Sequence, residues 1–181
     1  MTTLLFKLRS HHLRIYLQVF SAILLLSLLS INLFDLIVYG ESADAYLFIS
    51  PSICVAKEIG ELFHVAINIS SAENLQSVEF TITYNTSLLN VAQVVQGSFF
   101  PSPPKSYFRV EDNESLGFVK VNISIADSET PRSGNGVLAW ISFEVVQGPE
   151  LCTTSPLDLQ KTLFLNSALI PIPHDSVSAV Y

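Results

Sequence analysis

The feature that most constrains the fold is a period-two alternation of apolar and polar residues, repeated in short segments after residue 45. The clearest segment covers residues 118–125, where aliphatic and polar side chains alternate without interruption. Its apolar set is Val119, Val121, Ile123 and Ile125, and its polar set is Lys120, Asn122 and Ser124. Because successive side chains of a strand point to opposite faces, each such segment predicts a strand with one buried face.

The segments are separated by turns rich in Gly, Pro, Asn and Ser, and together they predict about nine strands. The predicted strands cover residues 46–49, 62–69, 78–84, 88–95, 107–110, 118–125, 137–146, 157–165 and 177–181. No convincing helical pattern follows residue 45. With one apolar face per strand, two sheets must bury their inner faces against each other. We therefore predict an all-β fold, a two-sheet antiparallel β-sandwich of the jelly-roll type.

A hydrophobic leader precedes this domain. Residues 15–34 carry no charge, and residues 1–14 carry Lys7, Arg9 and Arg14 but no acid. This pattern predicts one hydrophobic helix with its N-terminus in the cytoplasm and everything downstream exported. The leader is a cleaved signal peptide, with a small-x-small pattern at residues 43–45, or an uncleaved membrane anchor. We divide the chain into a leader, residues 1–45, and an exported domain, residues 46–181, at the cell surface or outside the cell.

Two further patterns fit export. Four N-x-Ser sequons begin at Asn68, Asn85, Asn113 and Asn122. Each asparagine falls on a predicted polar face or in a turn, where a glycan could be attached; chance occurrence is the alternative. The only two cysteines, Cys54 and Cys152, are predicted to form a disulfide that closes a long loop, with two buried free thiols as the alternative.

The residues assemble no catalytic constellation, so we expect no enzyme. His64 and His174 are the only histidines after the leader, and neither has neighbouring ligands at metal spacing. The acidic segments 111–114 and 127–129 could hold Ca²⁺ through oxygen ligands, but they match no calcium-loop pattern, and solvated turns are the simpler interpretation. We therefore expect no cofactor. The net charge of −7 excludes a nucleic-acid binder that relies on a basic field.

Exposed aromatic rings would indicate a carbohydrate-binding module, because flat rings stack on pyranose rings. Trp140, Tyr107 and Phe118 are the candidates for such a sugar platform, and polysaccharide would then be the ligand. Trp140 lies in the phase opposite Ala139 and Ile141, so it could face solvent. The alternative is that a loop or the adjoining sheet covers it.

The order of motifs after residue 45 resembles that of the cohesin domain, a relative of the cellulose-binding sandwich modules. Residues 55–69, 75–89, 91–99 and 134–146 carry the resemblance. Its best parts are the turn Tyr84-Asn85-Thr86-Ser87-Leu88-Leu89 and the segment Gly134-Asn135-Gly136-Val137-Leu138-Ala139-Trp140-Ile141-Ser142-Phe143. The resemblance implies a nine-stranded jelly roll without catalysis. Cohesins bind dockerin modules and thereby assemble polysaccharide-degrading enzymes or cell-surface proteins.

The resemblance also implies a partner-binding face, the flat outer surface of one sheet. By position this face comprises Glu79, Thr81, Thr83, Tyr107, Arg109, Lys120, Asn122 and Ser124. Our first hypothesis is therefore an exported, non-catalytic module that binds a dockerin-like or other surface protein. The alternatives are a carbohydrate-binding module of the same sandwich type, and a structural envelope protein held in the membrane through residues 15–34.

Overall fold

The computed structural model describes residues 20–21, 44–55, 58–147 and 154–181. The chain divides into two units, Met1–Ser42 and Ala43–Tyr181. The predicted leader helix over residues 15–34 lies outside the described residues, apart from Phe20 and Ser21, and so does the choice between signal peptide and anchor. Within the part of the chain that is described, no helix is both long and apolar enough to cross a membrane.

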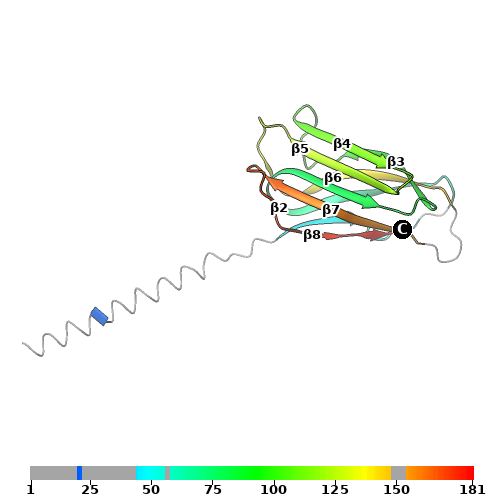
Figure 1. Ribbon diagram of the computed structural model, residues 1–181, viewed down its shortest axis with the longest axis horizontal. Coiled ribbons are helices and arrows are strands. Elements are labelled where there is room, and N and C mark those ends of the chain that lie inside the picture. The colour runs from blue at the N-terminus through cyan, green and yellow to red at the C-terminus, as the bar shows by residue number, and fades with distance from the viewer. Residues whose placement is uncertain (1–19, 22–43, 56–57, 148–153) are drawn as a thin grey trace, which may run out of the picture. The chain divides into compact units, whose positions relative to one another are not determined.

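The described residues of the domain form strands joined by turns, as the alternation predicts (Figure 1). The strands are β1 (Ala45–Ser50), β2 (Leu62–Thr83), β3 (Leu89–Gln96), β4 (Ser106–Asn113), β5 (Phe118–Ile125), β6 (Arg132–Val145), β7 (Pro156–Asn166), β8 (His174–Val177) and β9 (Ala179–Val180). β1 and β8 are parallel neighbours, and the other pairs are antiparallel.

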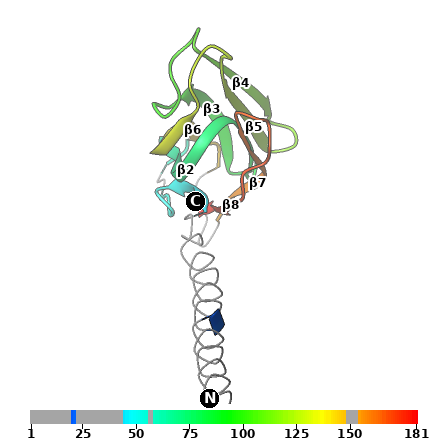
Figure 2. The ribbon, with the colours of Figure 1, turned by 90° about the vertical axis from the view of Figure 1, so that its left-hand side faces the viewer.

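The pairings define two layers that share β2. Sheet I runs in the order β3, β6, the first part of β2, β1 and β8. Sheet II contains β4, β5, the last part of β2, and β7, with β9 paired to β7. Figure 2 shows β3 and β6 on the left side of the domain and β5 and β7 on the right. The predicted two-sheet sandwich is therefore confirmed.

The alternation predicts two separate strands, at residues 62–69 and 78–84, but the structure joins them in the 22-residue strand β2. β2 pairs with β6 up to Leu75 and with β5 from Ser77, and register shifts follow Ile69 and Ala72. Ser71 and Asn74 take positive φ angles of 54° and 52° at this bend. The bend carries β2 from one sheet to the other. In the sequence, such a bend and a loop between two strands both show up only as a break in the alternation, so the sequence could not tell them apart.

The core lies between the inner faces of the two sheets. All four predicted inward residues of β5 are buried, and Phe80, Phe143 and Phe164 are among the largest side chains with no exposure. Phe63 stacks on both Phe143 and Tyr181, which closes one end of the core. The phase predicted from the sequence is therefore confirmed for β5 and for the second part of β2.

Two strands are longer than predicted. β6 begins at Arg132, so residues 132–136, which precede the predicted strand 137–146, also belong to the strand. The Asn135 side chain accepts a hydrogen bond from the Ser71 N–H, and the Ser133 hydroxyl accepts one from the Asn74 N–H. β4 extends to Asn113, so most of the predicted acidic turn 111–114 is an edge strand paired with β5. In both cases tertiary pairing overrides a local turn signal.

Candidate functional site

The outer face of sheet II brings together most of the predicted partner-binding residues. β4 and β5 pair Arg109 with Asn122 and Tyr107 with Ser124, and β5 and β2 pair Asn122 with Glu79. Paired side chains on one face of a sheet lie within contact distance. The register therefore forms a row of three polar residues across three strands, which the sequence alone places only on separate strands.

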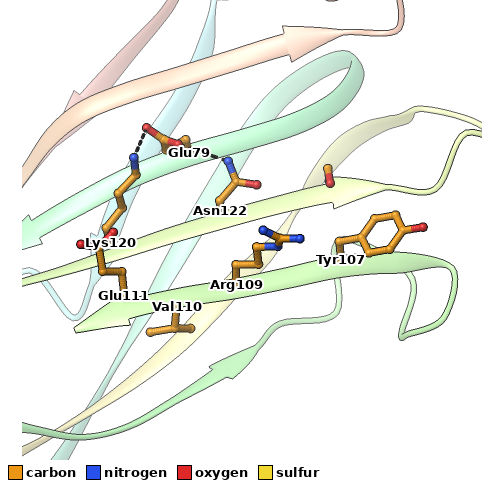
Figure 3. A pocket seen from close by; sticks show the side chains of 8 residues that line it. Glu79, Tyr107, Arg109, Val110, Glu111, Lys120 and Asn122 are labelled. Carbon is orange, nitrogen blue, oxygen red and sulfur yellow. Dashed lines mark hydrogen bonds and ion pairs between the residues drawn. The ribbon is translucent and has the colours of Figure 1, made fainter.

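An ion pair holds the centre of this face. Lys120 Nζ lies 2.8 Å from Glu79 Oε1, and Asn122 Nδ2 donates a hydrogen bond of 3.2 Å to Glu79 Oε2 (Figure 3). The hydrogen bond from Lys120 is the main cause that lowers the pKa of Glu79, and the same contact raises the pKa of Lys120. Both carboxylate oxygens of Glu79 are thus engaged, which fixes the carboxylate in one orientation.

Beside this network lies a shallow hollow of about 580 Å³. It is lined by Glu79, Tyr107, Arg109, Val110, Glu111, Lys120, Asn122 and Ser124. Figure 3 shows Tyr107 and Arg109 projecting from β4 next to the β5 side chains. Tyr107 is 58% exposed, and no carboxylate of the described residues forms an ion pair with Arg109. A free guanidinium and an exposed phenol ring therefore border a fixed carboxylate.

The structure changes the composition of the predicted face in two ways. Thr81 is only 7% exposed, because it lies between Lys120 on β5 and Gln160 on β7. It is therefore a poor contact residue, contrary to the prediction, and Thr83 is half-buried on the same strand. Val110 and Glu111 line the hollow but are absent from the predicted set. The signal for Glu111 was its period-two spacing from Tyr107 and Arg109, hidden by the interpretation of residues 111–114 as a turn.

The three rings of the predicted sugar platform do not share one face. Trp140 is 46% exposed, but it lies on β6 in sheet I, opposite Val95 and Ala66. Tyr107 and Phe118 lie on the outer face of sheet II, at opposite ends of the β4–β5 pair. A flat sugar-binding surface made of these three rings is therefore not present.

The four sequon asparagines occupy different settings. Asn68 lies in the first part of β2, and its Nδ2 donates to the carbonyl of Ala66 at 3.2 Å. Asn85 and Asn113 cap turns, accepting hydrogen bonds through Oδ1 from the N–H groups of Ser87 and Leu116. Asn122 lies in the hollow. None of the four is fully buried, as the predicted polar phase requires.

The predicted disulfide cannot be followed, because Cys152 lies outside the described residues. Among the described residues Cys54 has no disulfide partner; it is buried, and its Sγ lies 3.9 Å from the Pro51 carbonyl oxygen. Burial raises the pKa of this thiol, which makes it less reactive. The pairing of Cys54 with Cys152 stays a prediction.

One end of the sandwich holds a buried phenol next to acidic side chains. Burial is the main cause that raises the pKa of Tyr84 to about 12, and Asp112 and Glu114 add to it. The Tyr84 hydroxyl has no hydrogen-bond partner at bonding distance in the described structure, although Asp112 lies close enough to interact with it. Across those same residues, no three His, Cys, Asp or Glu side chains gather as metal ligands would.

Comparisons with known proteins give one consistent result. The model of the cohesin domain matches residues 55–168. No curated protein sequence matches the chain significantly. Among solved structures, a non-cellulosomal cohesin from the hyperthermophilic archaeon Archaeoglobus fulgidus is 20% identical, with a TM-score of 0.62, over 76% of this chain and 89% of that one.

Two bacterial cohesins solved in complex with dockerins have the same fold. The sixth cohesin of scaffoldin B from Acetivibrio cellulolyticus, bound to a mutant Cel5 dockerin, is 20% identical, with a TM-score of 0.64, over 76% of this chain and 97% of that one. The OlpC cohesin from Clostridium thermocellum, in a cohesin–dockerin complex, is 14% identical, with a TM-score of 0.65, over 76% and 91%. The domain model covers most of the chain, and the sandwich has the same architecture; this chain belongs to the cohesin family.

Proposed function

We propose that the chain is an exported, non-catalytic docking module that binds a dockerin-type partner through the outer face of sheet II. The observation that carries the proposal is the polar network in the hollow, where Glu79, Lys120 and Asn122 are fixed by their mutual contacts. Side chains that are already held in place lose little entropy when a partner binds. Such a face suits a protein partner with a complementary surface better than it suits a small molecule.

The electrostatics of the hollow indicate what the partner presents. Glu79 and Lys120 neutralise each other, whereas Arg109 has no ion-pair partner among the described residues. A carboxylate of the partner placed opposite Arg109 would form a charge-assisted pair, and the exposed Tyr107 ring next to it offers apolar contact area. We expect these two residues to be the main contacts, surrounded by the rim residues Val110 and Glu111.

The test is affinity capture from the host's surface extract with the full chain as bait, followed by identification of the bound proteins by mass spectrometry. We expect the wild-type chain to capture a dockerin-bearing protein. Arg109→Glu should weaken its binding at least tenfold, because it places like charges against each other at the interface. The matched control is Arg132→Glu, the same charge reversal at an exposed residue outside the hollow.

Two results would contradict the proposal. One is equal capture of the dockerin-bearing protein by the wild-type chain and Arg109→Glu, which would move the contact to another surface. The other is capture of no dockerin-bearing protein from an extract that contains such proteins. Loss of binding in both Arg109→Glu and Arg132→Glu would contradict a contact that is local to the hollow.

Export to the cell surface is part of the proposal, and it is supported by the basic and then apolar leader. Cleavage of the leader would release a secreted module, whereas retention of residues 15–34 would anchor it. Mass spectrometry of the mature N-terminus distinguishes the two. Recovery of the full-length chain from the cytoplasmic fraction alone would contradict export.

A further inference from the structure

The outer face of sheet I carries a cluster of apolar side chains that no described segment covers, which we name the apolar belt. Its members are Tyr46, Phe48, Val95, Val137, Trp140 and Val177. Val95 lies opposite Trp140, and Phe48 lies opposite Val177, so the belt crosses the sheet from β3 to β8. Trp140, Val95 and Val177 are 46%, 45% and 42% exposed. Contiguous apolar side chains on an outer face are a feature that soluble proteins often cover.

Asn68 lies inside the belt. On one side it is paired with Phe48 of β1, and on the other with Val137 of β6. Trp140 is opposite Ala66, two residues earlier on the same face of β2, which places its ring diagonally next to Asn68. Asn68 is also the first residue of a sequon that Ser70 completes. The central polar group of the belt is therefore a potential attachment point for an oligosaccharide.

We infer that Asn68 is an N-glycan acceptor and that the attached sugar covers the apolar belt by packing on Trp140 and Phe48. A pyranose ring has one face made of C–H groups, which packs on an aromatic ring, and an edge of hydroxyl groups, which stays in water. The sugar would thus replace an exposed apolar surface by a hydrated one while remaining covalently attached at its centre.

The amide geometry is compatible with this modification. In the transfer, Asn68 Nδ2 bonds to the anomeric carbon of a lipid-phosphate-linked oligosaccharide, and the anomeric C–O bond to phosphate breaks. The lipid phosphate leaves with that electron pair, and one amide proton passes to solvent. The second amide hydrogen remains and can keep the observed bond to the Ala66 carbonyl, so the modified side chain fits the folded strand.

The sequons at Asn122 and Asn85 lack this environment. Asn122 lies among Glu79, Lys120 and Arg109, and Asn85 is in an exposed turn with its Oδ1 bound to the Ser87 N–H. Asn68 is also on the sheet opposite the hollow, so its glycan leaves the proposed docking face open. The inference therefore rests on the export part of the proposed function and is independent of the docking face.

The test uses the full chain, expressed behind the secretion signal of an N-glycosylating host. Trp140 is the only tryptophan of the chain, so its fluorescence reports directly on the belt. Peptide mapping of the wild-type chain measures which sequons are modified. Two further variants each keep one sequon: the first keeps Asn68, and the second, the matched control, keeps Asn85. In each, the other three sequon asparagines are changed to Gln.

We expect a glycan at Asn68 in the wild-type chain. In the variant that keeps Asn68, acrylamide quenching of Trp140 should fall at least twofold relative to the same variant carrying Ser70→Ala, and the Tm should rise by about 3 °C. Trp140→Ala should remove most of that rise. A glycan at Asn85 should leave the quenching unchanged. An unmodified Asn68 in the wild-type chain would overturn the inference, and so would a modified Asn68 with Trp140 as accessible as in the Ser70→Ala variant.

Discussion

Replacing Phe80 by Ala tests the strand phase on which both sheets depend. Phe80 has no exposed surface, and it lies on the inner face of β2 opposite Val121, which is equally buried. The substitution removes a whole aromatic ring from a close-packed core and leaves a cavity that the paired strands of sheet II cannot close. Phe→Ala changes at such positions cost about 3–5 kcal/mol, from lost transfer free energy and the cavity together.

Urea denaturation of the full chain, followed by fluorescence, measures this loss. An ordinary domain is stabilised by roughly 5–15 kcal/mol, so a loss of about 4 kcal/mol removes a large share of its stability. Because part of the stability remains, the variant should still fold at low temperature. It should lower the urea midpoint by roughly 2 M without a change of slope. The matched control is Phe118→Ala, the same change at a half-buried residue on the outer face of β5, with an expected loss below about 1.5 kcal/mol.

The reasoning is refuted if Phe80→Ala costs less than about 1 kcal/mol. A larger loss for Phe118→Ala than for Phe80→Ala would show that the inner and outer faces of sheet II are exchanged. That exchange would also bury Glu79 and Asn122, since a shift of one residue moves every side chain to the other face.

Asp112→Asn should stabilise the domain slightly at neutral pH, because burial and then Glu114 raise the pKa of Asp112 in the fold, while solvent screening at this exposed residue keeps the gain small. In the wild-type chain, stability is therefore lost as the pH rises from the pKa of Asp112 in the unfolded chain through its raised pKa in the fold. Urea titrations should show that the gain from Asp112→Asn vanishes below about pH 4. A gain that persists there would contradict the electrostatic cause. Gly97→Ala should cost at least about 2 kcal/mol, because a Cβ at Gly97 would overlap the Val137 carbonyl oxygen. Thermal unfolding measures this loss, with Gly60→Ala as the control. A Cβ at Gly60 meets nothing within 4 Å, but the φ of 84° at this position strains any residue other than Gly. A smaller loss for Gly97→Ala than for Gly60→Ala would refute the clash.

Much of the fold could be predicted because burial in a strand is a local property. Val119, Val121 and Ile123 are inward in the structure for the same reason that they stand out in the sequence: every second residue of a strand faces the core. The outward phase of Lys120 and Asn122 follows from the same rule. The family resemblance, in turn, rests on the order of such strands, and the family model confirms it.

The composition of the candidate site could be predicted only in part. The sequence assigned eight residues from separate strands to the partner-binding face. Six of these eight line the hollow, together with Val110 and Glu111, which were not predicted. Thr81 was wrong because its burial depends on the long side chains of Lys120 and Gln160 on the neighbouring strands. The early start of β6 at Arg132 has a related reason, since the Asn135 side chain accepts a hydrogen bond from the Ser71 N–H at the bend of β2.

The sequence by itself determined that the domain is an all-β sandwich and which side of β5 and of the second part of β2 is buried. Those properties depend on the spacing of residues along one strand. Only the tertiary structure decided that one long strand serves both sheets, that Glu79 meets Lys120 and Asn122, and that Asn68 lies among aromatic rings. These contacts depend on the register between strands that are distant in sequence, which is fixed by the packing of the whole core.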